Sequence, residues 1–173
     1  MGIASSLFFS SNDSDKQTLH RRITPSDEQF REQKDRWNEL AEHLIGALKA
    51  GTGCPIRTWL QGSYKYATQI RPPRKGDEFD IDLGIFVCWS GQAQNGPHRF
   101  DDLRDNLQLS LETYGASNEA VTRVGKPLKA RCGRVHYFGD FHIDVPIYHL
   151  DPDADQRTLA AASGWEVSDP TAL

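Results

Sequence analysis

Two aspartates in one short segment have the spacing that metal-dependent phosphate chemistry requires. Asp80 and Asp82 lie two residues apart in Phe79–Val87, whose β-branched and aromatic residues predict a strand. Side chains alternate along a strand, so both carboxylates project from one face while the apolar residues occupy the other. A third carboxylate, Asp144, stands in a second apolar segment, His142–Pro146, with the same alternation. If the two strands are neighbours, three carboxylates meet at one place.

Carboxylates that lie this close repel one another, and divalent cations relieve the repulsion. Mg²⁺ prefers oxygen ligands from carboxylates, phosphates and water. Two such ions about 3.5–4 Å apart activate an attacking hydroxyl and stabilise the leaving oxygen of an in-line displacement. An Asp-x-Asp pair alone also suits a solvated strand face, but a carboxylate among apolar residues is costly unless it is satisfied. The predicted catalytic residues and metal ligands are therefore Asp80, Asp82 and Asp144, with two Mg²⁺ ions, or Mn²⁺, as the cofactor.

A glycine-serine turn provides a second element of the candidate site. Gly62-Ser63 follows the predicted strand Pro55–Leu60 and precedes a predicted short helix. Such a turn presents backbone N–H groups and a hydroxyl to an anion. Alone, the dipeptide is only a turn signal. Its place before the Asp pair, with a basic loop between them, makes it a candidate phosphate-binding turn.

The elements that position these residues follow from the apolar pattern. A long amphipathic helix is predicted from Thr24, with Thr24 as cap and Pro25 in the first position, to Gly51 and Gly53. A second helix is predicted from Phe100 to Gly115. Because the helices do not alternate regularly with the strands, we expect an α/β (α+β) fold, a mixed, twisted sheet with helices packed on one side. Further strands are predicted at Val121–Val124, Lys129–Tyr137 and Asp140–Leu150.

These motifs together resemble those of the polymerase-β-like nucleotidyltransferases. Within that superfamily the chain is most similar to the bacterial CD-NTases, relatives of cyclic GMP–AMP synthase that make cyclic nucleotide signals. The resemblance implies a polymerase-β-like nucleotidyltransferase core at residues 24–173, after an N-terminal segment at residues 1–23. The likeness is carried by Leu60–Lys65, Glu78–Leu83, His142–Pro146 and Gly164–Pro170.

By position, the resemblance implies a role for each motif residue. Asp80 and Asp82 would bind the metals and, through them, the donor triphosphate. Asp144 would complete the metal site and act as base toward the incoming ribose hydroxyl, directly or through the metal. The nucleotide-binding residues would be Gly62 and Ser63, which hold the triphosphate, and Gln61, which shapes the turn.

The implied activity is Mg²⁺-dependent transfer of nucleotidyl groups from ATP, GTP or other NTPs onto a ribose hydroxyl, giving a cyclic di- or trinucleotide in antiphage (CBASS) defence. Three alternatives stay open: linear oligonucleotide synthesis, AMP transfer onto a protein, and a non-catalytic scaffold. In the family a helical lobe usually follows the Ser-Asp-Pro segment. We expect that lobe to be absent here, or supplied from elsewhere, and an activating protein partner remains an option.

The composition bounds the remaining possibilities. A chain of 173 residues fits one domain, and its net charge of −4 argues against a broad nucleic-acid-coating surface. No segment approaches the ~20 apolar residues of a bilayer span, so no membrane partner is expected. Three widely spaced cysteines favour reduced thiols and a cytoplasmic location. Met1–Ser6 matches a myristoylation pattern that also occurs by chance, and lipidation is not expected.

Other polar residues near the motifs have two interpretations each. His142 shares the predicted face of Asp144, so it either orients a carboxylate or contacts a nucleotide, and a hydrogen-bonded structural role is favoured. The basic residues either contact phosphates or keep a loop and an edge strand soluble, and the second interpretation is favoured. They are Arg71, Arg74 and Lys75, and Arg123, Lys126, Lys129, Arg131 and Arg134.

Overall fold

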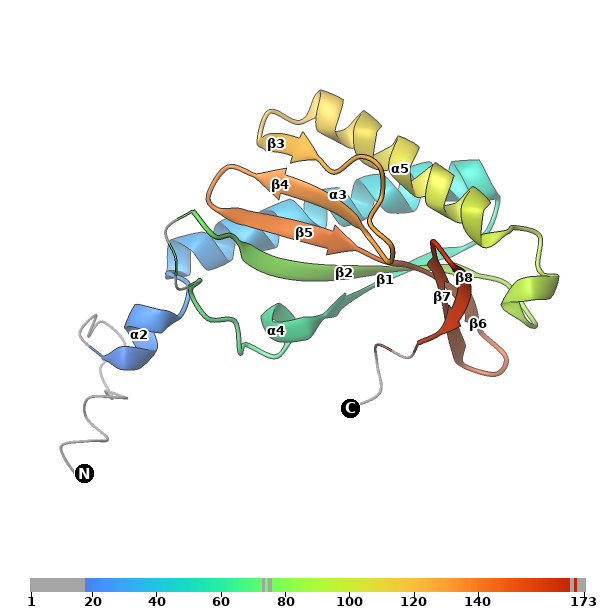
Figure 1. Ribbon diagram of the computed structural model, residues 1–173, viewed down its shortest axis with the longest axis horizontal. Coiled ribbons are helices and arrows are strands. Elements are labelled where there is room, and N and C mark those ends of the chain that lie inside the picture. Colours follow the sequence, from blue (N-terminus) through green and yellow to red (C-terminus); the bar gives the residue numbers. More distant parts are fainter. Residues whose placement is uncertain (1–17, 73, 75, 169, 171–173) are drawn as a thin grey trace.

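The computed structural model describes residues 18–168 and 170, except 73 and 75 (Figure 1). The predictions for Met1–Ser6 and Lys75 lie outside the described residues. The helical elements are α2 (Leu19–Ile23), α3 (Asp27–Thr52), α4 (Gly62–Lys65), the 3₁₀ turn η1 (Ala93–Asn95) and α5 (Phe100–Ser117). The strands are β1 (Ile56–Gln61), β2 (Phe79–Cys88), β3 (Val121–Val124), β4 (Gly133–Tyr137), β5 (Phe141–Val145), β6 (Ile147–Asp151), β7 (Gln156–Ala161) and β8 (Gly164–Val167).

The strands form one mixed sheet around β2, as the sequence predicts. β2 pairs with β1 in antiparallel orientation and, on its other edge, with β5 and then β6 in parallel orientation. β5 continues to β4 and β3, whereas β6 continues to β7 and β8. Figure 1 shows β6–β8 running across the direction of β3–β5. The sheet is twisted and open. Along one edge of β2 it splits into two branches, one of β5, β4 and β3 and the other of β6, β7 and β8.

Pro146 is the point of this division. The predicted strand Asp140–Leu150 is observed as two strands, β5 and β6, with Pro146 between them. Proline has no N–H group, so it cannot donate to the ladder. Its carbonyl still accepts a bond from Ile85 N at 3.0 Å, and both strands keep the same register along β2. The carboxylate-bearing half of the segment therefore stays aligned with Asp80 and Asp82.

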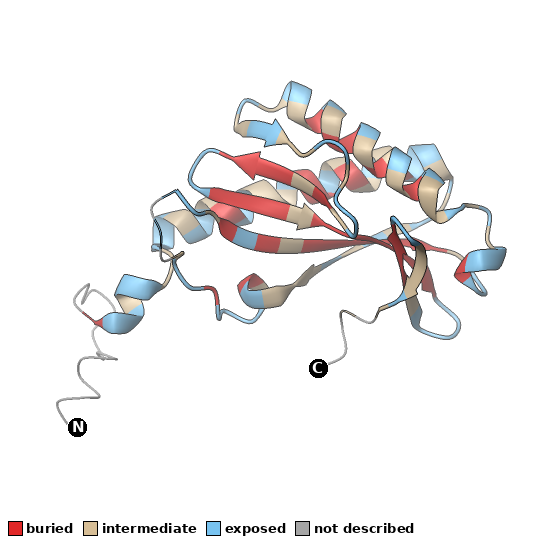
Figure 2. Cartoon of the chain, viewed as in Figure 1, coloured by how far each residue is buried: buried red, intermediate tan, exposed pale blue. Residues whose placement is uncertain are grey.

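The main core lies between the sheet and the two long helices, α3 and α5 (Figure 2). Both helices pack on the face of β2 that carries Ile81, Leu83 and Ile85. The carboxylates of β2 project from the opposite face, where Phe86 and Cys88 belong to a second, smaller core with β6 and β7. Burying a leucine side chain stabilises the fold by roughly 1.5–3 kcal/mol. The fully buried side chains include Leu40, Leu44, Leu48, Ile81, Leu83, Ile85, Leu103, Leu107 and Leu111.

The boundaries of both predicted helices need correction. α3 begins at Asp27, and its cap is Ser26, which forms a capping box with Gln29. Thr24 instead caps the end of α2, where its hydroxyl donates to His20 O at 2.8 Å. The second helix, α5, does not end at Gly115 but runs to Ser117. A Cβ on Gly115 would lie 2.5 Å from Val124 Cγ2, so glycine is required there for the approach of β3.

The predicted strand Lys129–Tyr137 is also shorter than expected. β4 begins at Gly133, and the residues before it form a loop beside α5. Arg104 holds this loop through its guanidinium, which donates to the carbonyls of Lys129 at 2.9 Å and Ala130 at 3.1 Å. The strands β7 and β8 were not predicted. None of the helices within the described residues is long and apolar enough to cross a membrane.

Candidate active site

The structure brings the three predicted carboxylates to one place on the sheet. Asp80 and Asp82 alternate with buried Phe79, Ile81 and Leu83 along β2. β5 lies parallel to β2 in a register that places Asp144 beside Asp82 and His142 beside Asp80. One ligand atom each from Asp80, His142 and Asp144 lies within 4.8 Å of the others. The arrangement follows directly from two parallel strands that both alternate polar and apolar residues.

The glycine-serine turn lies against the same carboxylates. β1 ends at Gln61, which is paired with Asp82, and α4 begins at Gly62. Gly62 has a φ of +64°, and a Cβ there would lie 2.3 Å from Asp82 Oδ2. Glycine suits this position twice, because the left-handed backbone disfavours a side chain and because a Cβ would displace the Asp82 carboxylate. Ser63 follows and is exposed beside the site.

The carboxylates differ in their affinity for protons. Burial raises the pKa of Asp82 to about 6, with further contributions from the charges of Asp80 and Asp144. Burial also acts to raise the pKa of Asp144, but the hydrogen bonds and charge of Arg134 outweigh it, and that pKa is lowered. The site therefore keeps Asp144 ionised. At Asp82 a bound cation would offset the cost of burying the charge and its repulsion by the neighbouring carboxylates.

Two cations from the β4 side face Asp144. Arg134 is paired with Asp144 across β4 and β5, and its Nη2 donates to Oδ2 at 2.6 Å. Nζ of Lys129 lies 3.9 Å from the same oxygen. The interpretation of these basic residues as phosphate contacts or solubilising charges therefore misses the role of Arg134. The sequence carries no signal for it, because the pairing depends on the register of two strands.

A second polar network lies behind Asp80. Oε2 of Glu78 lies 2.7 Å from Nδ1 of His136 and 2.9 Å from Nδ1 of His142. Nη2 of Arg123 lies 2.8 Å from Nε2 of His136. Both histidines are buried. Glu78 and His136 were not predicted as site residues.

One thiol also borders the carboxylates. Burial raises the pKa of Cys132 to about 12, and the charge of Asp144 adds to the effect. Such a cysteine stays a thiol at neutral pH, and only a thiolate is a good nucleophile or metal ligand. Cys132 is therefore part of the wall of the site.

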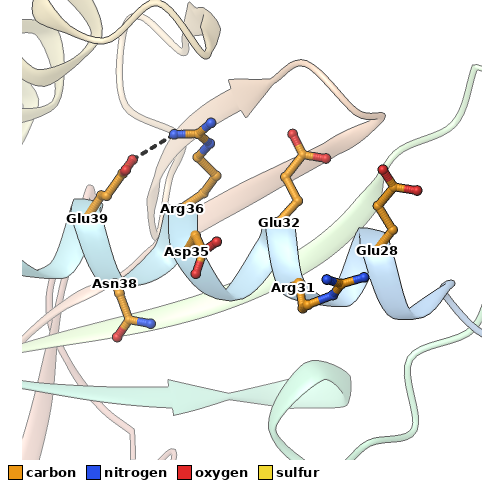
Figure 3. Close-up of a pocket in the computed structure, with 7 residues that line it drawn as sticks. All are labelled: Glu28, Arg31, Glu32, Asp35, Arg36, Asn38 and Glu39. Atoms are coloured by element: carbon orange, nitrogen blue, oxygen red, sulfur yellow. Dashed lines mark hydrogen bonds and ion pairs between the residues drawn. The ribbon is translucent and has the colours of Figure 1, made fainter.

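A large hollow of the surface lies elsewhere. It has a volume of about 750 Å³ and lies on α3, where four acidic side chains and two arginines line an open helix face (Figure 3). Arg36 and Glu39 form an ion pair of 2.9 Å there. Because α3 packs on the opposite face of the sheet from Asp80 and Asp82, this hollow is separate from the carboxylate centre.

The residues present fit a divalent metal centre. The donors are carboxylate oxygens with a buried imidazole nitrogen beside them, and hard divalent cations are bound by such oxygens. A parallel pair of carboxylate-bearing strands beside a glycine-serine turn is the arrangement expected of a nucleotidyltransferase core.

Comparison with known proteins agrees with this class. Residues 56–148 match the family model described as "Cyclic GMP-AMP synthase DncV-like, nucleotidyltransferase domain". The chain therefore belongs to the DncV-like nucleotidyltransferase family, among the CD-NTases of the polymerase-β-like superfamily. The predicted family and fold class are confirmed.

Two relatives and one solved structure illustrate the likeness. A cyclic GMP-AMP synthase of Escherichia albertii is 32% identical over 98% of this chain and 37% of its own length. One from Vibrio cholerae serotype O1 is 33% identical over 63% of this chain and 24% of its own length. The fold is similar to that of Escherichia coli DncV in its 3'-deoxy GTP bound form, with a TM-score of 0.79, 20% identity, and coverage of 94% of this chain and 58% of that chain. The chain thus spans only part of the length of the proteins it matches.

Proposed function

We propose that this chain carries the catalytic centre of a cyclic dinucleotide synthase that joins NTPs by nucleotidyl transfer. The observation that carries the proposal is the meeting of Asp80, Asp82 and Asp144 beside the Gly62 turn. The naming of its relatives as cyclic GMP-AMP synthases supports ATP and GTP as the substrates. Nucleotidyl transfer needs mainly positioning and neutralisation of charge, which this site is built to supply.

Asp80, Asp82 and Asp144 would hold two Mg²⁺ ions, with Mn²⁺ as a substitute. When bound, these ions supply charge neutralisation for the triphosphate and an activated attacking hydroxyl. Asp144 is ionised beside Arg134, a state that suits holding a cation better than accepting a proton. Of the two predicted roles of Asp144, that of metal ligand is therefore favoured over that of a direct base.

The turn residues would position the donor. With no side chain at Gly62, the triphosphate can approach the backbone beside Asp82. The exposed hydroxyl of Ser63 would donate to a phosphate oxygen, and Gln61 would set the end of β1. The ribose oxygen of the acceptor then bonds to the α-phosphorus as the bond to pyrophosphate breaks, and the proton of the acceptor hydroxyl passes to solvent.

We further propose that the product is a cyclic nucleotide signal of antiphage (CBASS) defence, made in the cytoplasm. The relatives are longer than this chain, and we infer that a helical lobe of the complete enzyme covers the nucleotide. An activating protein partner fits a signalling enzyme. Linear oligonucleotide synthesis and AMP transfer onto a protein use the same chemistry and differ in the acceptor.

Incubation of the chain with α-³²P-labelled ATP and GTP tests the proposal. The expected product is resistant to phosphatase and is lost with EDTA and in Asp80→Asn. The exposed carboxylate variant Asp105→Asn is the matched control and should keep the activity. A phosphatase-sensitive product would indicate a linear oligonucleotide, and label on protein would indicate AMP transfer. Absence of labelled product with either Mg²⁺ or Mn²⁺, also in a chain extended to the length of its relatives, would refute catalysis.

A further inference from the structure

One nitrogen beside the carboxylates has no hydrogen-bond partner among the described residues. Nε2 of His142 is buried, and the residue is only 7% exposed. The nitrogen lies 2.9 Å from Asp80 Oδ1, yet the two groups are not aligned as a hydrogen bond. A buried polar atom without a partner is costly, and native structures rarely keep one without a reason. This atom faces the carboxylate centre.

The network behind His142 determines where the proton of its ring lies. Arg123 can only donate, so Nε2 of His136 accepts from it and Nδ1 of His136 carries a proton toward Glu78. The Glu78 carboxylate also accepts from Nδ1 of His142 at 2.9 Å. In the tautomer that this hydrogen bond selects, the proton is on Nδ1, and the lone pair of Nε2 faces Asp80 and Asp144.

This arrangement is the one that orients metal-binding histidines in proteins. A ligating imidazole donates its other N–H to a carboxylate, which fixes the ring and its tautomer. Glu78 has that position relative to His142, and the ligand atoms of Asp80, His142 and Asp144 lie within 4.8 Å of one another. The alternative cluster of Glu78, His136 and His142 is already satisfied by hydrogen bonds among its own members.

We propose that Nε2 of His142 is a nitrogen ligand of the divalent-metal centre, together with Asp80 and Asp144, and that Glu78 orients it. This inference rests on the proposed function and extends the metal site beyond the three carboxylates. Mg²⁺ binds oxygen in strong preference to nitrogen. The first-row transition metals bind nitrogen and oxygen sites together, and Mn²⁺ is the weakest binder of that series. His142 should therefore make the centre prefer Mn²⁺ over Mg²⁺.

The test measures Mn²⁺ bound to the full 173-residue chain by electron paramagnetic resonance, with electron spin-echo envelope modulation to detect nitrogen. The wild-type chain should show coupling to one ¹⁴N nucleus. In His142→Gln the coupling should disappear, and Mn²⁺ affinity should fall about tenfold or more relative to Mg²⁺ affinity. The control is His149→Gln, which removes a buried histidine of β6, the strand that follows β5 along β2. This variant should change neither the nitrogen coupling nor the ratio of Mn²⁺ to Mg²⁺ affinity.

Glu78→Gln should keep the nitrogen coupling and weaken Mn²⁺ binding by about tenfold, because it disturbs only the orienting group. Wild-type chain that binds Mn²⁺ without nitrogen coupling, or a His142→Gln variant with unchanged metal preference, would overturn the inference and leave the carboxylate centre standing. Mn²⁺ binding that does not depend on Asp80, tested in Asp80→Asn, would instead reject the metal centre itself. If His142→Gln does not fold, the wild-type nitrogen coupling decides.

Discussion

Replacement of Asp82 by asparagine should stabilise the metal-free protein at neutral pH. Burial and the charges of Asp80 and Asp144 raise the pKa of Asp82 from 3.8 to about 6. At about 1.4 kcal/mol per pKa unit this shift corresponds to about 3 kcal/mol. Solvent reaches part of the side chain and screens the charge, so we expect about half of that value, roughly 1.5 kcal/mol, for Asp82→Asn.

The effect has a defined pH dependence. Below about pH 4 Asp82 is protonated in the folded and the unfolded chain, and the variant gains nothing. Between about pH 4 and 6 the folded chain binds the proton more tightly, so wild-type stability falls as the pH rises. Above about pH 6 the penalty is complete, and the stability advantage of the Asp82→Asn variant is constant.

Thermal unfolding in EDTA at about pH 4 and pH 8 measures this difference. For a domain of this size, roughly 1.5 kcal/mol corresponds to about 3–6 °C in melting temperature at the higher pH. Exposed Asp105→Asn is the control and should stay within about 0.5 kcal/mol of wild type. Excess Mg²⁺ should reverse the order by stabilising only the wild type. An Asp82→Asn variant that is less stable than wild type at pH 8 in EDTA would refute the reasoning.

Two further substitutions test the surroundings of the carboxylates. Gly62→Ala should lower nucleotidyl transfer by about 100-fold, because the new Cβ would displace the Asp82 carboxylate. It should lower the free energy of unfolding by only about 1–2 kcal/mol, because it strains a left-handed backbone. Product assays measure the first effect and denaturant unfolding the second. Arg134→Gln should lower the free energy of unfolding by about 2–3 kcal/mol at neutral pH, because it leaves Asp144 buried without its partner. Since the pKa of Asp144 is lowered in the fold, this loss should shrink as the pH falls below about 4, and a pH-independent loss would contradict the assignment.

The alternation of residues predicts the face of each strand from which the candidate carboxylates project. Asp80 and Asp82 share a face because apolar residues separate them, and Asp144 repeats the pattern in a second buried strand. Because β5 lies beside β2 in parallel register, this shared alternation brings the carboxylates together. The positive φ of Gly62 also follows from its residue type in a turn after a strand.

The residues that contact Asp144 and His142 are placed there by strand register, and local sequence does not encode register. Arg134 pairs with Asp144, and His136 with His142, only because β4 and β5 align as they do. The sequence predicts Gly115 as the end of a helix, whereas in the structure the missing side chain admits Val124 at close range. In each case a tertiary contact decides what the residue does.

Anomalous X-ray scattering from crystals grown with Mn²⁺ and a non-hydrolysable ATP analogue tests the central claim most directly. We predict two metal peaks about 3.5–4 Å apart, bound by Asp80, Asp82 and Asp144, with the triphosphate over Gly62 and Ser63. An analogue bound without metal at these carboxylates, or metal peaks at another place on the chain, would contradict the assignment of this face of the sheet as the catalytic centre.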